Sequence, residues 1–399
     1  MVVPYVPLEL VEEVIDMLGG DTKSLLSCSL VSIGWVHRSR RHLFSAIKLH
    51  SSSDIQSWFG TGLATCSGHV RSLDLAQNEE SKWIVPETLT GKISDFTSFH
   101  NVQTLTMAGL NLTLFNEQSL TRSFGHLSDR LTSLSVKDLT AHPHTLLFFI
   151  CMFPKLDDLK IDHLTPGEAS IPYKVPTVTP RFRGNLSLSH IKTNGTGMLA
   201  PFLDPPLPMA FEDVRVVECR FENPKPLKDL FAACQTTMKR IHVSKIFLGK
   251  FYSLIISLML WESYVFDTSD DISETPLIDL SPCGGLEEMR LSLIQLRQPS
   301  HWIEPILRTV TSTRVRKITF DTDFPTAAAD LETVINLQSW STLDATFLRM
   351  AHALDPMDEK LEVVFHALAR KPPVDPKPVD PGRFLEGCRT KATVSFQRA

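Results

Sequence analysis

Residues that could do chemistry are few and do not form a known catalytic or metal-binding pattern. The sequence holds no GxxxxGK[ST], GxSxG, HExxH or GxGxxG motif, and the NGTG segment 194–197 is typical of a turn. His142 and His144 could bind a metal ion, but no neighbouring Cys, His or carboxylate residues complete a set of four ligands. We therefore expect a protein that is not an enzyme, without catalytic residues, cofactor or metal, and with an exposed helix start near Pro143.

Composition and charge argue against further classes of protein. The chain has 399 residues, of which 43% are hydrophobic and 21% charged, which suits two or three domains or one long repeat array. A net charge of −5 over this length gives no sign of nucleic-acid or anionic-membrane binding. The basic residues Arg308, Arg314, Arg316 and Lys317 lack interleaved aromatic residues, which favours a solvated strand edge.

Cysteine usage and hydropathy favour a cytoplasmic or nuclear protein, or one found in both compartments. The seven cysteines are odd in number, scattered and never in a CxxC pair, as expected of reduced thiols: Cys28, Cys66, Cys151, Cys219, Cys234, Cys283 and Cys388. We see no signal peptide, and the most apolar stretch, Phe251 to Trp261, is half the length that a bilayer requires. We therefore expect no membrane contact.

The first 44 residues predict three short helices. Leu8, Val11, Val14, Ile15 and Leu18 follow the spacing of one helical face, with an acidic face opposite that we expect to be solvated. Pro7 suits the first turn, Gly19-Gly20 ends the helix, and Asp21 and Ser32 are suitable N-caps for a second and a third helix. Such a unit is too small to be securely stable alone, so it needs a partner or the rest of its chain.

This region resembles the F-box motif, in the form found in the large F-box families of fungi. The resemblance rests on PLEL from Pro7, on LLSCSLVS from Leu25, and on Trp35 with Leu43-Phe44. The sequence departs from the family at Ile33-Gly34, where a basic or polar pair is usual. Because glycine inside a helix costs about 1 kcal/mol relative to alanine, we expect the third helix to begin late or to bend there.

The resemblance implies docking to a Skp-type adaptor, and through it to a cullin–RING ubiquitin ligase. Carried over to this sequence, the adaptor-binding residues would be Pro7, Leu8, Leu10, Ile15, Leu18, Leu25, Leu26, Cys28, Val31 and Trp35. The alternative is that these residues form the core of a cap on the downstream domain. A cap would bury all of Leu8, Leu18, Leu25 and Trp35, whereas a docking module would leave part of that set exposed.

A second pattern repeats along the rest of the chain. Short segments with alternating apolar residues are centred on Leu73, Leu105, Leu134, Leu159, Leu186, Val214, Ile241, Met289 and Ile318, and most are 25 to 32 residues apart. Several are followed by an apolar residue expected to turn back into the core, namely Leu110, Leu139, Leu164 or Ile191. Helix-length segments lie between them, such as 143–153, 226–235 and 299–311. The pattern resembles irregular leucine-rich-repeat domains.

The predicted fold class is α/β: an N-terminal three-helix F-box followed by an irregular leucine-rich-repeat-like solenoid with a parallel sheet on its inner surface. The predicted domains are 1–45 for the helices, 46–370 for the solenoid, and 371–399 for a proline-rich segment with a tail or edge strand. Ala46 and Leu361 could each start a further strand. The long interval before Met289 predicts an inserted helix and loop within 251–274, and 371–382 is expected to be extended.

Solvent-facing strand positions form the candidate binding surface, because such a sheet holds its outward side chains in fixed register. The early strands present small neutral residues there, and the later strands present charges of both signs. The candidate target-binding residues are Asp158, Lys160, Asp213, Arg215, Arg240, His242, Glu288, Arg290 and Lys317.

Two functions remain open. In the first, the chain is the non-catalytic substrate receptor of a Skp–cullin–F-box ubiquitin ligase, with an unknown target protein held by the repeats. In the second, the chain is a repeat scaffold with no ubiquitin role, and its N-terminal helices only cap the solenoid.

Overall fold

The computed structural model describes residues 7–77, 82–85, 96–167, 182–193, 209–221, 225–244, 247–248, 278–293, 303–322, 340–354, 360–367 and 392–398. The chain divides into two compact units, Met1–Arg181 and Phe182–Ala399, which we treat separately. The predicted domain boundaries after residues 45 and 370 stay predictions. The predicted insertion at 251–274 and the extended segment 371–382 lie outside the described residues.

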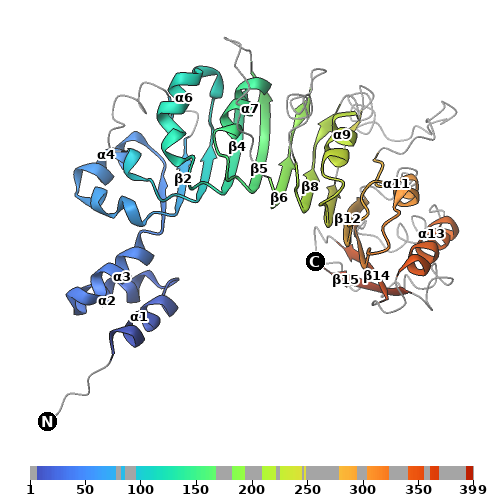
Figure 1. Ribbon diagram of the computed structural model, residues 1–399, viewed down its shortest axis with the longest axis horizontal. Helices are drawn as coiled ribbons and strands as arrows, with labels where there is room; N and C mark the ends of the chain where they lie inside the picture. Colours follow the sequence, from blue (N-terminus) through green and yellow to red (C-terminus); the bar gives the residue numbers. More distant parts are fainter. Residues whose placement is uncertain are drawn as a thin grey trace, which may run out of the picture. The chain divides into compact units, whose positions relative to one another are not determined.

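The first unit begins with the three predicted helices, α1 (Leu8–Met17), α2 (Thr22–Val31) and α3 (Ile33–Leu43), and both α1 and α2 pack against α3 (Figure 1). The Asp21 side chain accepts hydrogen bonds from the amides of Lys23 and Ser24, and Ser32 accepts one from the amide of Gly34. Both predicted N-caps are therefore present. The expectation of a late start for α3 was wrong. Gly34 lies in the first turn, next to the cap, where glycine costs less than in a helix interior.

Five parallel strands follow in chain order: β1 (Ala46–Leu49), β2 (Ser72–Ala76), β3 (Thr104–Ala108), β4 (Ser133–Ala141) and β5 (Asp158–Pro166). Their register aligns the predicted central residues Leu73, Leu105, Leu134 and Leu159, all of which are buried. Between the strands lie α4 (Ser52–Gly60), η1 (Leu63–His69), η2 (Phe96–Ser98), η3 (Leu112–Leu114), α6 (Glu117–Phe124), η4 (Gly125–Leu127) and α7 (Pro143–Cys151).

The core of this unit lies between the sheet and those helices. The helix α7 buries every residue from Thr145 to Cys151, because its sequence is apolar all round. Phe149 packs edge-on against Phe124 of α6 with ring centroids 5.4 Å apart. Each strand–helix repeat therefore relies on its neighbours to cover its apolar face.

In the described residues of the second unit, the larger sheet has seven parallel strands: β6 (Asn185–Ser189), β8 (Asp213–Val217), β10 (Arg240–Ser244), β12 (Glu288–Leu293), β13 (Lys317–Thr322), β14 (Leu361–Ala367) and β15 (Ala392–Arg398). The described helices of this unit are α9 (Lys225–Ala233), α11 (Ile303–Thr309) and α13 (Trp340–Ala353). The strands predicted at Ala46, at the nine repeat centres and at Leu361 are all present, as is an edge strand near the C-terminus. The α/β class and the parallel sheet are confirmed.

A second, smaller sheet was not predicted. It consists of β7 (Lys192–Thr193), β9 (Arg220–Phe221) and β11 (Phe247–Leu248), which also pair in parallel. Strands of two residues carry too little alternation to be recognised in a sequence. Across the described ranges, no helix combines the length and the apolar character needed to cross a bilayer.

A residue with left-handed backbone conformation recurs in five successive repeats. A residue with positive φ follows the main strand segment and precedes a fully or almost fully buried residue; these positive-φ residues are Gly109, Asp138, His163, His190 and Glu218. The left-handed residue breaks the strand alternation, so that two neighbouring residues, Lys137 and Asp138, are both exposed before Leu139 turns inward. The predicted inward turn of Leu110, Leu139, Leu164 and Ile191 is confirmed. The left-handed backbone conformation of the residue before each of them causes it.

Of these five residues, only Gly109 adopts a positive φ without steric strain, because it has no Cβ atom. Its φ is 75°, and a Cβ atom there would lie 2.6 Å from the backbone oxygen of Gln77.

We expect Gly109→Ala to lower the free energy of unfolding by about 1 to 3 kcal/mol, because alanine would meet both the φ strain and the Gln77 backbone. Gly125→Ala is the matched control, since Gly125 has φ −61° and its added Cβ would only contact a methyl group of Thr121. The control should leave stability unchanged or raise it by about 0.4 to 1 kcal/mol. Urea unfolding of both variants tests this, and equal effects would contradict it.

Candidate docking surfaces

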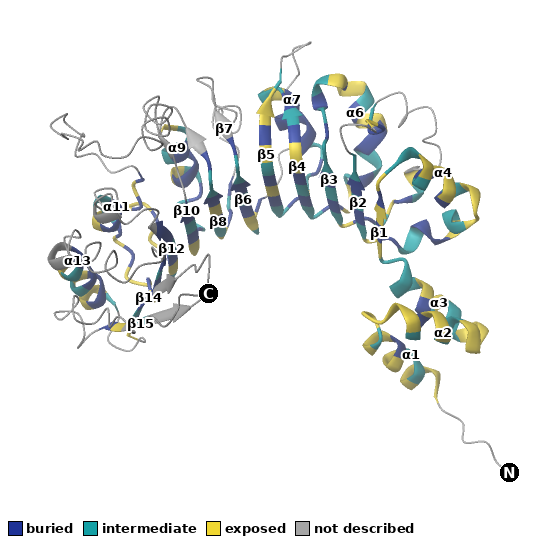
Figure 2. Cartoon of the chain, turned by 180° about the vertical axis from the view of Figure 1, so that it is seen from behind, coloured by how far each residue is buried: buried dark blue, intermediate teal, exposed yellow. Residues whose placement is uncertain are grey.

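The helices α1 to α3 expose a concentration of apolar side chains. Of nine large apolar residues that are exposed in the described part of the chain, eight lie within residues 8–33 and are 46% to 93% exposed, the ninth being Leu114. Figure 2 shows α1 and α2 largely in the colour of exposed residues. We call these eight the apolar docking surface: Leu8, Leu10, Val14, Met17, Leu26, Leu30, Val31 and Ile33.

The small size of the helices explains this exposure. Ile15 is the buried residue of α1, Leu25 that of α2 and Ser39 that of α3. The apolar arc of α1 is wider than the strip that contacts α3, so Leu10, Val14 and Met17 are left in solvent.

The structure divides the predicted adaptor-binding residues into three groups. Ile15 and Leu25 are 1% exposed and belong to the helical core, so they support the surface from beneath. Leu18, Cys28 and Trp35 are partly exposed, and the remainder are exposed, namely Pro7, Leu8, Leu10, Leu26 and Val31. Leu8 is 46% exposed, so Leu8, Leu18, Leu25 and Trp35 are not all buried within the chain.

Four exposed apolar residues were not among the predicted adaptor-binding residues: Val14, Met17, Leu30 and Ile33. The spacing offered a signal, because Leu26 and Leu30 are four residues apart on one face of α2. Ile33 is the most exposed of all at 93%, because it follows the Ser32 cap directly.

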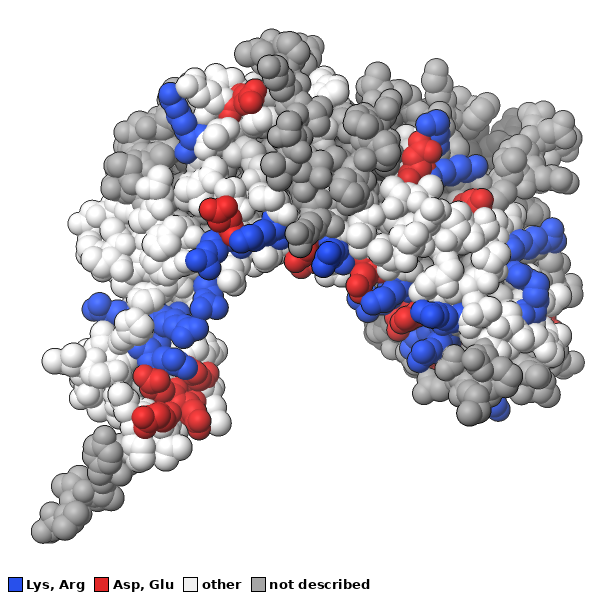
Figure 3. Space-filling model, in the orientation of Figure 1, with Lys and Arg blue, Asp and Glu red and all other residues white. Residues whose placement is uncertain are grey.

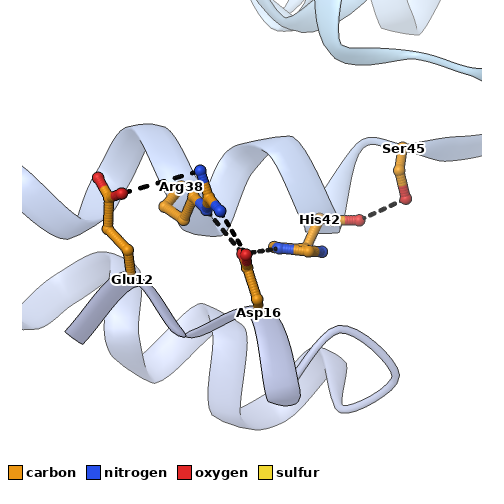
Figure 4. Close-up of polar contacts among 5 residues, drawn as sticks. All are labelled: Glu12, Asp16, Arg38, His42 and Ser45. Carbon is orange, nitrogen blue, oxygen red and sulfur yellow. Dashed lines mark hydrogen bonds and ion pairs between the residues drawn. The ribbon is translucent and has the colours of Figure 1, made fainter. Parts of the chain in front are cut away.

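Polar contacts hold α1 against α3 (Figure 4). Arg38 donates from Nε to Oδ1 of Asp16 at 2.6 Å and from Nη2 to the other carboxylate oxygen, and His42 Nε2 lies 2.7 Å from Oδ1. Glu12 adds a longer ion pair to Arg38, at 3.8 Å. We call Asp16, Arg38 and His42 the clasp. The acidic face of α1 is thus partly engaged with α3, where solvation was expected.

The hydrogen bonds from Arg38 and His42 hold the pKa of Asp16 well below its usual range. Gly19 assists, because a Cβ atom at this position would come within 3.2 Å of the His42 ring. The clasp therefore fixes the orientation of α1, and with it the side chains that α1 presents to solvent.

The second candidate surface is the polar face of the strands. In the first unit Asp158 and Lys160 lie on β5, opposite Ser133 and Ser135 of β4. The other seven predicted target-binding residues lie on β8, β10, β12 and β13 of the second unit. Each alternates with buried residues such as Val214, Ile241 and Met289, as expected of strands with one buried face.

Within the second unit, four of these predicted residues form a charge ladder together with Glu362 of β14. Neighbouring strands place residues of opposite sign in register, in the order Asp213, Arg240, Glu288, Lys317 and Glu362. Arg240 pairs with Asp213 at 3.0 Å and Lys317 with Glu362 at 2.9 Å. Figure 3 shows red and blue side chains following one another along this part of the sheet.

A parallel row of basic residues lies two residues further along the strands. Register places Arg215, His242 and Arg290 side by side on β8, β10 and β12. Arg290 donates from Nε and Nη2 to Asp321 at 2.7 and 2.9 Å, and Asp321 is only 6% exposed. Asp321 and Glu362 were missed as members of this surface, although both stand at alternate positions of their strands.

The candidate metal ligand His142 is the N-cap of α7, where its Nδ1 accepts from the amide of His144 at 3.4 Å. In the described ranges no three His, Cys, Asp or Glu side chains lie where they could hold a metal ion.

We expect Asp16→Asn to loosen α1 from α3, because the amide loses the charge that Arg38 and His42 share. Amide hydrogen exchange of residues 8–17 should become faster, while exchange in β2 to β5 stays unchanged. Glu13→Gln is the control, since Glu13 is an exposed acidic residue of the same helix outside the clasp. Acid should act like the mutation, because a carboxyl with a lowered pKa stabilises the fold above its ordinary pKa and loses this effect as the pH falls. Equal exchange in both variants would contradict a role for the clasp.

Comparisons with known proteins give little beyond this geometry. No family model matches the chain, and no curated protein matches it. Among solved structures, the leucine-rich-repeat-containing protein LegL7 from Legionella pneumophila is similar with a TM-score of 0.39 and 11% identity, over 75% of this chain and 93% of that chain. At this TM-score the likeness carries no argument about function, and the F-box resemblance rests on the N-terminal residues themselves.

Proposed function

We propose that the chain is the substrate-binding subunit of a Skp–cullin–F-box ubiquitin ligase. The observation that carries the proposal is the apolar docking surface, on the segment whose sequence resembles an F-box. Exposed apolar side chains concentrated in one small part of a protein are typical of a protein interface.

Burial of the apolar docking surface would contribute favourably to binding. Burying one large apolar side chain contributes about 1.5 to 3 kcal/mol, and eight are available. Association and side-chain ordering offset much of that gain. The clasp reduces the ordering cost, because it fixes α1 before the partner arrives.

The partner in this proposal is a Skp-type adaptor, which would place the chain on a cullin–RING scaffold. The polar face of the strands would then hold a target protein. The contribution to ubiquitin transfer is tethering, which raises the effective concentration of a target lysine to roughly the millimolar range and requires no catalytic residue in this chain.

The competing function is a repeat scaffold in which the helices are only a cap. Burial of Ile15 and Leu25 fits either function, since any folded helical segment needs a core. Exposure of Leu30 and Ile33 supports the first, because a docking module uses such side chains whereas a cap does not need them in water.

Calorimetry with a purified Skp-type adaptor tests the proposal. We expect a one-to-one complex with the full chain, weakened at least a hundredfold by Leu30→Asp with Ile33→Asp. These two side chains are 87% and 93% exposed, so their replacement should not unfold the helices. Leu25→Asp is unsuitable, since Leu25 is buried.

Leu114→Asp is the matched control, because Leu114 is a 50% exposed leucine outside the docking surface, and its replacement should leave binding unchanged. Circular dichroism and thermal unfolding establish that each variant is folded. A folded wild-type chain that does not bind the adaptor would overturn the ligase function and favour the scaffold.

A further inference from the structure

The two charged rows on the polar face of the second unit differ in how they are neutralised. In the charge ladder, each residue has at least one neighbour of opposite sign on an adjacent strand. The adjacent basic row, Arg215, His242 and Arg290, has no acidic residue in its register, since it continues as Ser187 on β6 and Thr319 on β13. Its charge is therefore balanced only from outside the row.

One acidic group lies against the basic row. Asp321 occupies the next row and accepts both hydrogen bonds from Arg290, while its Oδ2 lies 3.7 Å from His242 Nε2, beyond hydrogen-bonding distance. That nitrogen is buried and has no hydrogen-bond partner among the described residues. Arg215 is exposed and has no ion-pair partner in the described part of the chain. Arg215 is thus left with an uncompensated positive charge.

The members of the basic row differ in how far water reaches them. The side chain of His242 is 17% exposed, whereas that of Arg290 is 43% exposed and Arg215 is also in solvent. Neighbouring strands are about 4.8 Å apart, so the two arginines start about 10 Å apart with His242 between them. Long side chains can close that distance over one small group. Arg290 uses two of its five N–H donors on Asp321 and keeps three for a ligand.

The pKa of His242 also reflects the positive charge of the basic row. Burial and the neighbouring Arg215 and Arg290 lower its pKa to about 4, although Asp321 and Asp213 act in the opposite direction. The imidazole is therefore neutral at pH 7, and Arg215, Arg290 and Asp321 together carry one net positive charge, since Asp213 is paired with Arg240 of the charge ladder. An anion placed above the ring would supply the acceptor that Nε2 lacks once it is protonated.

We propose that Arg215, His242 and Arg290 form a site for a glutamate or aspartate side chain of an acidic target segment. The proposal deepens the target-binding half of the proposed function and rests on it only for the identity of the ligand as part of a target. Charge complementarity selects the class of partner, since a carboxylate matches the two-pronged donor geometry of an arginine.

The charge balance favours a carboxylate over a phosphate. A single net positive charge neutralises a monoanion, whereas a phosphoserine carries −1.5 to −2 charges at pH 7 and needs a cluster of arginines. Asp321 and Asp213 lie beside the row and would repel the second charge.

Nuclear magnetic resonance of the full chain with ¹³C-labelled histidine rings tests the site. The probes are capped pentapeptides Gly-Glu-Gly-Glu-Gly, the same peptide with glutamine, and the same peptide with phosphoserine. The resonance of His242, assigned by its loss in His242→Gln, should shift saturably with the glutamate peptide, and its pKa should rise from about 4 toward the ordinary value. Arg215→Gln should weaken this binding at least tenfold.

Lys239→Gln is the matched control, because Lys239 is an exposed cation next to β10 that is already paired with Glu212 at 2.8 Å. It should leave peptide binding unchanged. Equal shifts with the glutamine peptide, no effect of Arg215→Gln, or binding of the phosphoserine peptide more than tenfold tighter than the glutamate peptide would each overturn the proposal. Adaptor affinity measured on Arg215→Gln should equal that of the wild type. If the wild type binds no adaptor yet still binds the glutamate peptide, the site stands and the ligase function falls.

Discussion

Three helices of ten or eleven residues cannot hide their apolar side chains from water, and this constraint shapes the N-terminal part of the protein. The core of α1 and α2 is little more than Ile15 and Leu25 packed on α3. A larger core would hold α1 to α3 by packing. Here the hydrogen bonds of the clasp provide part of that attachment. What remains exposed is an ordered apolar surface, and an ordered surface binds at lower entropic cost than a mobile one.

The strand–helix repeats solve a related problem differently. Each repeat buries its apolar residues by stacking on the next, so the alternating residues of the opposite face are free to be polar. A left-handed residue late in the strand, such as Asp138 or His163, turns the next side chain back into the core. Because hydrogen bonding fixes the register, charges on adjacent strands meet in rows, and the difference between the charge ladder and the basic row follows from which residue types stand at equivalent positions.

The sequence was sufficient for features that depend on local rules. Helix caps at Asp21 and Ser32 and strand centres such as Leu105 follow from short-range chemistry and period-two alternation. The Asp16–Arg38 contact spans 22 residues and depends on how two helices pack, so an acidic helical face appeared merely solvated. The exposure of Met17 and Ile33 was unpredictable for a related reason, because apolar spacing identifies a helical face but not how much of it a neighbour covers. Asp321 was missed because a diagonal pair across strands requires the register, which alternation alone does not provide.

The central claim is that the exposed apolar side chains of α1, α2 and the start of α3 form a binding surface for an adaptor. The most direct measurement is carbene footprinting of the full chain, with and without a purified Skp-type adaptor, read by mass spectrometry at single residues. The account predicts that labelling of Met17, Leu30 and Ile33 falls strongly in the complex while labelling of Leu114 stays the same. Unchanged labelling of those three residues at saturating adaptor would contradict it.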